Sequence, residues 1–337
     1  MMPIVKLGFL GAGIAACHHA AAATALGAEV VVACTRNGQS SRWSAFQHHA
    51  PHAHQVADGQ QLLDDPHIDA VVACMSWDVM PQWAERLLRC PKPILIEKPI
   101  TLDAGHLKRI IAAANLHPHN KLFGYNRRYY EPVAKLQQRL KQGGLKGVSV
   151  VISEAVADHV RRLGAPIVEH LIPFTSAHTL DLLLHLFGAL QPVAMGAYAE
   201  RGAAAPFVAY NGLLKTRHGV PLSLSINADD PSPIGVRCLF DDGTTWHLSP
   251  LETLTVYQGY EVRQPTAQHK TRRYTPKQIH QWQADASLKP GFKEQMAAFL
   301  AGNYGPGASL NDALQVLELI DAIQSNVWHV EHRHPPQ

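Results

Sequence analysis

The spacing of apolar positions predicts a parallel sheet in the first part of the chain. Near-continuous apolar runs alternate there with stretches of helical periodicity, as expected for buried strands with helices on both faces of a sheet. Helices are expected from about residue 14 to 26, closed by Gly27, and from about Asp78 and Asp103 onward. The apolar runs are "IVKLGFL" (4–10), "EVVVAC" (29–34), "DAVVAC" (69–74), "PILIE" (93–97) and "KLFGY" (121–125).

The pattern changes after about residue 145. The segment "GVSVVISEAVADH" (147–159) alternates for longer than the earlier runs, which favours a half-buried strand. In "VRCLFDDGTTWHLS" (236–249), Asp242-Gly243 stands between two strand-like runs and predicts a hairpin. Two helices are expected near the end, over 292–302 and 309–326, the second with Ser309 as its N-cap.

These patterns predict an α/β protein of two domains, for which a length of 337 residues is ample. We expect residues 1–125 to form a Rossmann domain that binds a dinucleotide on a doubly wound parallel sheet. Residues 126–337 are expected to form an α+β domain on a large, mostly antiparallel sheet, for substrate binding and oligomerisation. The closing helices are free to pack back on the first domain.

Composition narrows the class of protein. The net charge of +3 is spread without a basic block, so we expect no nucleic-acid partner. Charged residues make up only 17% of the chain, which favours an oligomer with covered surface. The five cysteines are never spaced as CxxC, as is typical of reduced thiols in the cytoplasm.

The segment "LGFLGAGIAACHHAAAA" (7–23) has an alternative interpretation as a signal peptide, because its centre is apolar and its end is rich in alanine. Only Lys6 supplies a basic start, however, and His18 and His19 interrupt the segment. No apolar run reaches the roughly 18 residues of a transmembrane helix. We therefore expect a soluble, cytoplasmic protein that does not contact the membrane.

The turn after the first expected strand carries a dinucleotide-binding pattern. Gly11, Gly13 and Ala16 fit G-x-G-x-x-G/A, with Ile14 and Ala15 between them. Here the pattern follows a strand and opens a helix, where glycines allow close backbone approach and the helix N-terminus offers N–H groups to a pyrophosphate. The alternative is an ordinary strand-to-helix turn.

The end of the second strand is where such folds contact the adenosine ribose. An NAD enzyme usually has a carboxylate there, whereas this chain has Thr35 and Arg36. Since no carboxylate repels a 2′-phosphate and Arg36 can pair with one, NADP(H) is favoured and NAD(H) remains possible. Alternatively, Arg36 is a solvated loop residue.

Glu97 and Lys98 follow the apolar run of 93–97 and stand directly before Pro99. In open α/β sheets, ligands bind outside the carboxyl ends of the strands, so Lys98 is expected to point into the cofactor crevice. There it can donate to a substrate hydroxyl or to the nicotinamide ribose, and we count Glu97 and Ser76 with it as cofactor-binding residues. A solvated Glu-Lys ion pair is the alternative.

With "GFLGAG" (8–13) and "EKP" (97–99) in place, the chain resembles the glucose-fructose oxidoreductase, inositol dehydrogenase and rhizopine catabolism family, Gfo/Idh/MocA. The segment "GYNRRYYEP" (124–132) and the closing helices are similar to the family's pattern, so the resemblance covers essentially the whole chain. It implies nicotinamide-dependent oxidation or reduction of sugar or cyclitol groups, with Lys98 in the active site. It also suggests a homodimer or homotetramer that associates through the exposed face of the second sheet.

The family's second catalytic motif has Asp and, four residues later, His, and two registers of it compete here. Asp181 and His185 match the spacing literally, but aligning Asp181 with the following Leu-Phe-Gly puts the family histidine at His178. This second register satisfies more of the motif and leaves Phe174 at the position of the family's aspartate. His178 is then the expected general acid/base, and His185 is expected to be a helix-packing residue.

The proton relay therefore moves elsewhere, or hydride transfer is altered or lost. Candidates for relay or substrate contact are Tyr125, Asn126, Arg128, Glu169, His170 and Asp181, and Arg127 and Tyr130 are further candidates for a sugar or acidic-sugar pocket. A structural role for one or both arginines is the alternative. The run with His48, His49, His52 and His54 offers no carboxylate or cysteine at a ligand spacing, so we expect no metal site.

Three functions remain open from the sequence. The first is an NADP(H)-dependent oxidoreductase acting on a sugar, amino sugar, nucleotide sugar or cyclitol, with Lys98 orienting the reacting oxygen. The second, motivated by Phe174, is a nucleotide-binding sensor or regulator without catalysis. The third is an enzyme that cleaves glycosides while its bound cofactor is oxidised and reduced in turn.

Overall fold

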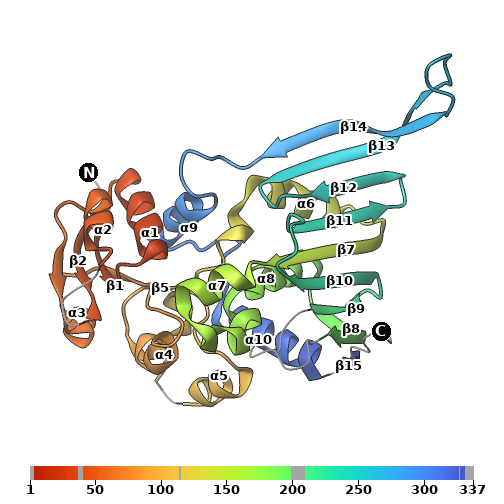
Figure 1. Cartoon of the computed structure of the whole chain (residues 1–337). Helices are drawn as coiled ribbons and strands as arrows, with labels where there is room; N and C mark the ends of the chain where they lie inside the picture. Colours follow the sequence, from red (N-terminus) through yellow and green to blue (C-terminus); the bar gives the residue numbers. More distant parts are fainter. Residues whose placement is uncertain (1–3, 37–40, 114, 199–208, 326, 331–337) are drawn as a thin grey trace. The chain divides into compact units, whose positions relative to one another are not determined.

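The computed structural model describes residues 4–36, 41–113, 115–198, 209–325 and 327–330 (Figure 1). By internal packing the chain divides into two compact units. The first unit comprises Met1–Tyr129, Ile172–Leu182 and Asp285–Asp321, and the second comprises Tyr130–Leu171, Leu183–Ala284 and Ala322–Gln337. The first break, after Tyr129, lies close to the domain boundary expected after residue 125, which stays a prediction.

A parallel six-stranded sheet forms the centre of the first unit, as predicted, with the strand order β3-β2-β1-β4-β5-β6. Its strands are β1 (Lys6–Leu10), β2 (Glu29–Cys34), β3 (His54–Val56), β4 (Ala70–Ala73), β5 (Ile94–Ile96) and β6 (Lys121–Phe123). The helices of this unit include α1 (Ile14–Ala25), α2 (Trp43–His49), α3 (Gly59–Asp64), α4 (Met80–Arg89), α5 (Ala104–Ile111) and α9 (Phe292–Leu300).

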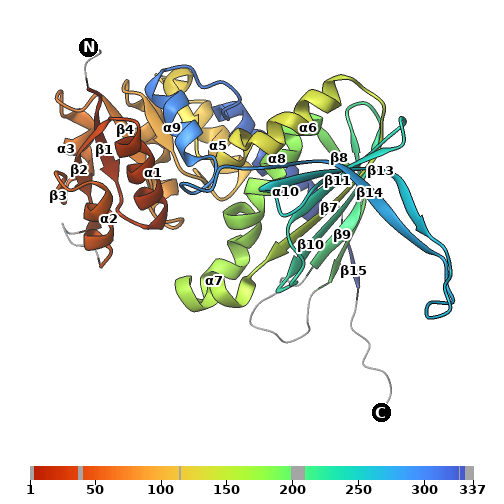
Figure 2. The same ribbon diagram turned by 90° about the horizontal axis from the view of Figure 1, so that it is seen from above.

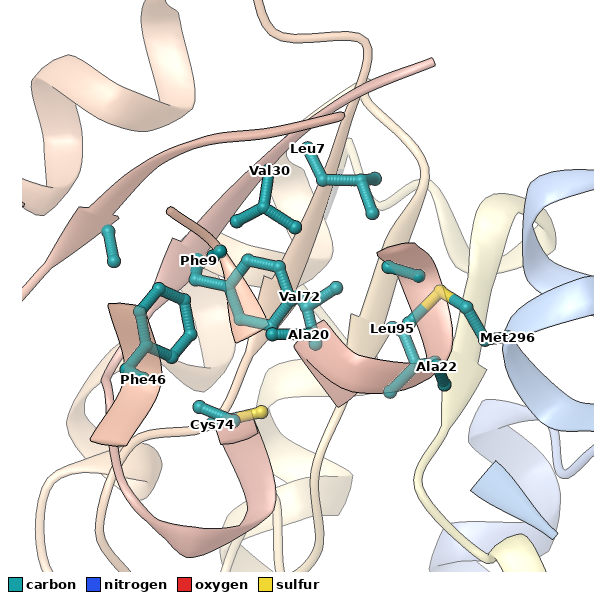
Figure 3. Packing of buried hydrophobic residues seen from close by; sticks show 14 of the residues in the cluster. Leu7, Phe9, Ala20, Ala22, Val30, Phe46, Val72, Cys74, Leu95 and Met296 are labelled. Carbon is teal, nitrogen blue, oxygen red and sulfur yellow. The ribbon is translucent and has the colours of Figure 1, made fainter. Parts of the chain in front are cut away.

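Alternating side chains of β1 face opposite sides of this sheet. Leu7 and Phe9 are fully buried in a cluster with α1, α2 and α9, to which Phe46 and Met296 contribute (Figure 3). Gly8 faces the other side, where a Cβ would lie 2.9 Å from the Leu62 side chain of α3. The apolar runs are continuous because both faces are covered, which is what the sequence pattern indicated.

The ends of the helices follow the local sequence. Asp103 caps α5 by accepting the His106 N–H at 2.7 Å, and Gly27, at φ 80°, follows α1 as expected. The last helix, α10 (Leu310–Ser325), begins after Ser309, whose hydroxyl accepts the Asp312 N–H at 3.2 Å. In the described part of the chain, no helix combines the length and the apolar character that crossing a bilayer requires.

The second unit is built on a nine-stranded sheet in the order β14-β13-β12-β11-β7-β10-β9-β8-β15. Most neighbours are antiparallel, as predicted, and the pairs β7–β10 and β8–β15 are parallel. Helix α6 (Glu131–Lys141) packs against β12, β13 and β14 (Figure 2). The strands are β7 (Leu145–Glu154), β8 (Leu190–Tyr198), β9 (Ala209–Thr216), β10 (Pro221–Ala228), β11 (Gly235–Phe240), β12 (Thr244–Leu248), β13 (Thr253–Arg263), β14 (Arg273–Gln283) and β15 (Val327–Val330).

Two local expectations in this unit can be compared with the structure. The hairpin at Asp242-Gly243 is confirmed, because it joins β11 to β12 with Gly243 at φ 76°. The long strand predicted over 147–159 is wrong at its end, because β7 stops at Glu154 and α7 (Val156–Leu163) follows. The Asp229 carboxylate accepts the Ala157 N–H at 3.1 Å, which satisfies a donor of the first helical turn.

Strands β13 and β14 extend beyond their neighbours as a two-stranded ribbon (Figure 1). Cross-strand pairing places Tyr260 opposite Pro276 and Val262 opposite Tyr274. These residues share one face of the ribbon, and Tyr260 and Tyr274 are exposed to 66% and 60%. The ribbon therefore presents apolar side chains to solvent.

Candidate active site

A cavity of about 520 Å³ opens at the carboxyl ends of β1, β2 and β4. Seven of the nine residues expected to bind cofactor line it, namely Gly11, Gly13, Ile14, Ala15, Thr35, Arg36 and Ser76. The fold thus brings together a turn, a strand end and a loop that are far apart in the sequence. The other two, Glu97 and Lys98, are not among the lining residues.

The glycine turn is shaped for close backbone approach. Gly11 has φ +104°, and a Cβ on it would lie 2.5 Å from the Cys74 carbonyl oxygen, so a side chain is excluded there. A Cβ on Gly13, which precedes the first turn of α1, would meet nothing within 4 Å. Gly13, Ile14 and Ala15 line the cavity, and the first turn of α1 contains neither an acidic residue nor a side-chain cap, so this helix N-terminus suits a pyrophosphate.

Sequence reasoning missed two residues at or beside this cavity, Trp83 in its lining and Gln55 next to Thr35. Gln55 of β3 donates its amide N–H to the Thr35 hydroxyl at 2.5 Å and thereby orients it. Trp83 of α4 also lines the cavity, and the guanidinium of Arg86 lies 5.1 Å from the centre of its ring. No sequence pattern predicts the role of Gln55, because it depends on β3 lying beside β2 in the sheet. Trp83 could have been predicted as a cavity residue, because it is an aromatic residue on the helix that follows Ser76.

Glu97 contacts His19, a contact that the sequence analysis did not predict. Its Oε1 lies 2.8 Å from Nε2 of His19, in α1, and its Oε2 accepts the Lys98 main-chain N–H at 3.2 Å. Both residues are buried, His19 completely. The carboxylate that ends the apolar run is therefore paired inside the first unit.

The Lys98 ammonium contacts Phe174, in the π-helical turn η5 (Ile172–Ser176) that precedes α8 (Ala177–Phe187). Its Nζ donates to the Phe174 carbonyl oxygen and lies 4.9 Å from the centre of the Phe174 ring. A cation over an aromatic face is attracted by the ring quadrupole. Phe174, expected at the position of the family's aspartate, thus lies beside the lysine.

His178, on the first turn of α8, is close enough to these groups to be affected by their charge. Burial, followed by the charges of Lys98, Arg127 and Lys289, lowers its pKa well below the ordinary value. Its ring makes an edge-on contact with Tyr125, at 6.0 Å between centres, and its buried Nδ1 has no hydrogen-bond partner among the described residues. Burial raises the pKa of Tyr125 above its ordinary range.

Arg128 and Asp181 are bound to each other. The guanidinium donates to both carboxylate oxygens, at 2.9 and 2.6 Å, and also lies 3.2 Å from Asp312. Burial alone would lower the pKa of Arg128, but these two carboxylates raise it above its ordinary value. Arg128 and Asp181 are almost fully buried, and their expected relay or substrate role stays a prediction.

The remaining candidates occupy separate places. Asn126 donates to the Pro290 carbonyl at 2.9 Å, and Arg127 donates to the Thr179 hydroxyl at 2.5 Å. Glu169, which is exposed, and His170 belong to the second unit. His185 contacts Gln137 at 3.2 Å, in keeping with a packing role, and the described residues contain no group of His, Cys, Asp and Glu that could hold a metal.

Comparison with known proteins finds oxidoreductases that are similar to this chain. Residues 5–123 match the model of an oxidoreductase family with an NAD-binding Rossmann fold. An inositol 2-dehydrogenase from Acidothermus cellulolyticus is 25% identical over 300 residues, 84% of this chain and 85% of that protein. Inositol 2-dehydrogenase 2 from Saccharopolyspora erythraea is 26% identical over 77% of this chain and 78% of its own.

Solved structures share the whole fold. KijD10, a 3-ketoreductase from Actinomadura kijaniata in complex with NADP and TDP-benzene, has a TM-score of 0.70 at 17% identity, covering 97% of this chain and 99% of its own. A myo-inositol dehydrogenase from Corynebacterium glutamicum has a TM-score of 0.69 at 17% identity, covering 96% and 97%. Residues 5–123 are thus similar to the NAD-binding Rossmann domain of the Gfo/Idh/MocA oxidoreductase family, and the two inositol 2-dehydrogenases resemble most of the chain.

Proposed function

We propose that the chain is an NADP(H)-dependent oxidoreductase that transfers hydride between nicotinamide and a hydroxyl or carbonyl of a sugar, amino sugar, nucleotide sugar or cyclitol. The observation that carries this proposal is the contact of Lys98 with Phe174, four residues before His178 on the adjoining helical segments η5 and α8, within the unit that contains the dinucleotide cavity. The curated inositol dehydrogenases and the NADP-bound 3-ketoreductase support the substrate class and the cofactor.

Residues of this chain orient the substrate and transfer the proton. Bound nicotinamide supplies or accepts the hydride. Lys98 orients the reacting oxygen through its ammonium, and His178 gives or takes the proton at Nε2, since its Nδ1 is buried. The cavity is suited to a dinucleotide because Gly11 allows the tight turn against Cys74 and Gly13 leaves the main chain open at the start of α1.

The proposal is tested by titrating the purified protein with NADPH and NADH and then screening sugar and cyclitol carbonyls and alcohols. Steady conversion of the nicotinamide with a substrate of this class supports it. NADPH binding with complete inertness toward the panel favours the sensor alternative, to which the Phe174–Lys98 contact gives some weight. Glycoside cleavage without net change in nicotinamide absorbance identifies the third function.

Arg36 is expected to select NADPH. It is exposed at the cavity, where a guanidinium can bind a 2′-phosphate with charge-assisted hydrogen bonds. We expect Arg36→Ala to weaken NADPH binding roughly tenfold and to leave NADH binding within about twofold. Fluorescence titration measures both, with Arg89→Ala as the control, an exposed arginine that is paired with Glu85 and is not among the cavity's lining residues. Equal losses for both nucleotides would remove Arg36 from cofactor selection.

The low pKa of His178 predicts the pH profile. If the neutral form of His178 is the base, kcat/KM should stay level as the pH is lowered through 6.5, the ordinary histidine pKa. It should fall only at a pH well below that value, where the His178 ring becomes protonated. Phe174→Asp adds a carboxylate that stabilises the charged imidazole, so the acid limb should move up by about one pH unit. Phe174→Asn is the matched control. The same acid limb in both variants would contradict the role of His178.

Self-association through the exposed face of the second sheet, as a homodimer or homotetramer, is also proposed. The apolar side chains of the β13–β14 ribbon support it, as do the exposed residues Val193 of β8 and Leu213 of β9. A cytoplasmic location stays a prediction.

A further inference from the structure

A fully buried histidine of α1 joins the cofactor helix to the Glu97-Lys98 segment. Nε2 of His19 lies 2.8 Å from Oε1 of Glu97, and the two residues are 78 positions apart. Neither belongs to the cavity described above. A buried carboxylate must be paired, so this contact is required wherever Glu97 is ionised.

The other oxygen of Glu97 faces the main chain of the next residue. Oε2 accepts the Lys98 N–H at 3.2 Å, and the Glu97 N–H itself donates to the Ala73 carbonyl at 2.8 Å. The same carboxylate therefore contacts both α1 and the backbone that carries the lysine. Through Ala73, the segment is also tied to the end of β4.

Two neighbours confine this pair. Gly124 follows β6, and a Cβ on it would lie 2.8 Å from the Glu97 carboxyl carbon, so only glycine leaves room for the carboxylate. On the other side, the Phe292 ring of α9 lies 4.6 Å from the His19 ring, between centres. Packing on both sides limits the positions that either side chain can take.

The surroundings also fix the tautomer of His19. Its Nδ1 is buried and has no hydrogen-bond partner among the described residues. A proton on Nδ1 would be a buried donor without an acceptor, which is unfavourable, so one ring proton belongs on Nε2. From there it points at Glu97.

We propose that His19 is a positioning residue for Lys98. It holds the Glu97 carboxylate, which in turn holds the Lys98 main chain, so that the ammonium keeps a fixed place at the carboxyl end of β5, where the nicotinamide would be expected to bind. This role rests on the proposed catalytic function of Lys98. Because α1 begins at the Gly11–Gly13 turn, one helix contacts the pyrophosphate at its start and sets the lysine from its second turn.

The test compares His19→Leu in two backgrounds, the wild-type chain and Lys98→Ala. In the wild-type chain we expect His19→Leu to lower kcat on the order of tenfold, since small displacements of an orienting group are costly, and to change NADPH affinity less than about threefold. In the Lys98→Ala background, the same substitution should have no further effect on kcat. His19→Gln, whose amide can still donate to Glu97, should recover most of the activity.

Controls separate this proposal from the proposed function. His67→Leu removes an exposed histidine of the same unit and should change nothing. If His19→Leu fails to fold, Glu97→Gln and Glu97→Ala are compared instead. The amide oxygen of the Gln variant can still accept the Lys98 N–H, so its kcat should be higher than that of the Ala variant. An equal loss of kcat in both backgrounds, or none in folded His19→Leu, overturns the positioning role. Full turnover in Lys98→Ala would instead overturn the proposed function.

Discussion

Replacing Lys98 by alanine should reduce turnover on the order of 10² or more, because the reacting oxygen then loses the charged donor that orients it. NADPH affinity should change little, since Lys98 is not among the residues that line the dinucleotide cavity. Single-turnover kinetics with NADPH and a substrate from the screen measure the loss directly. The effect should lie in kcat more than in KM.

Two further variants make this test specific. Lys98→Met keeps an apolar stem against Phe174 and should be as slow as the alanine variant, which shows that charge matters and packing does not. Lys108→Met removes an exposed lysine that is paired with Glu318 and should leave turnover unchanged. A Lys98→Met enzyme with normal turnover would rule out the lysine as the orienting group.

The second large effect is expected on stability, at the buried pair of Arg128 and Asp181. Asp181→Asn leaves a buried guanidinium without its two-point partner, and breaking such a pair costs about 3–5 kcal/mol. We expect the lower end of that range, because Asp312 remains 3.2 Å from Arg128. Denaturant unfolding followed by circular dichroism measures the change in free energy.

The control for this prediction is Glu318→Gln, which removes a half-exposed ion pair with Lys108 and should cost less than about 1 kcal/mol. The double variant Arg128→Met/Asp181→Leu replaces both charges by apolar side chains and should recover most of the lost stability. If Asp181→Asn proves no more costly than Glu318→Gln, the pair does not hold the first unit together.

Local sequence patterns predicted most of the fold, because burial and turn conformation depend mainly on the residues of one segment. The apolar runs of β1, β2 and β4 are continuous since both sheet faces are covered, and Asp242-Gly243 predicted its hairpin from turn chemistry alone. The strand expected over 147–159 was too long, because apolar alternation continues into the first turn of α7 and does not mark where pairing ends.

The candidate site was harder to predict, because its contacts join distant segments. Seven of the residues expected to bind the dinucleotide line one cavity, since the glycine turn and strand ends have a local signature. No spacing links His19 to Glu97 or Gln55 to Thr35, which meet only through the order of strands in the sheet. For Arg128 the sequence left a substrate role and a structural role open, and its charge is paired with Asp181 inside the fold, a contact that no local spacing indicated.

The π-helical turn η5 has a consequence for chain length. A π turn closes its hydrogen bond one residue later than an α turn, so Ile172–Ser176 contains an extra residue relative to a regular helix. Deleting one residue there would let the α-helix continue and would rotate the preceding side chains by about 100° around its axis. Phe174 would then leave Lys98, and a different side chain would replace it. Relatives that differ by a single insertion at this turn can therefore present different chemistry to the same lysine without any substitution at the lysine itself.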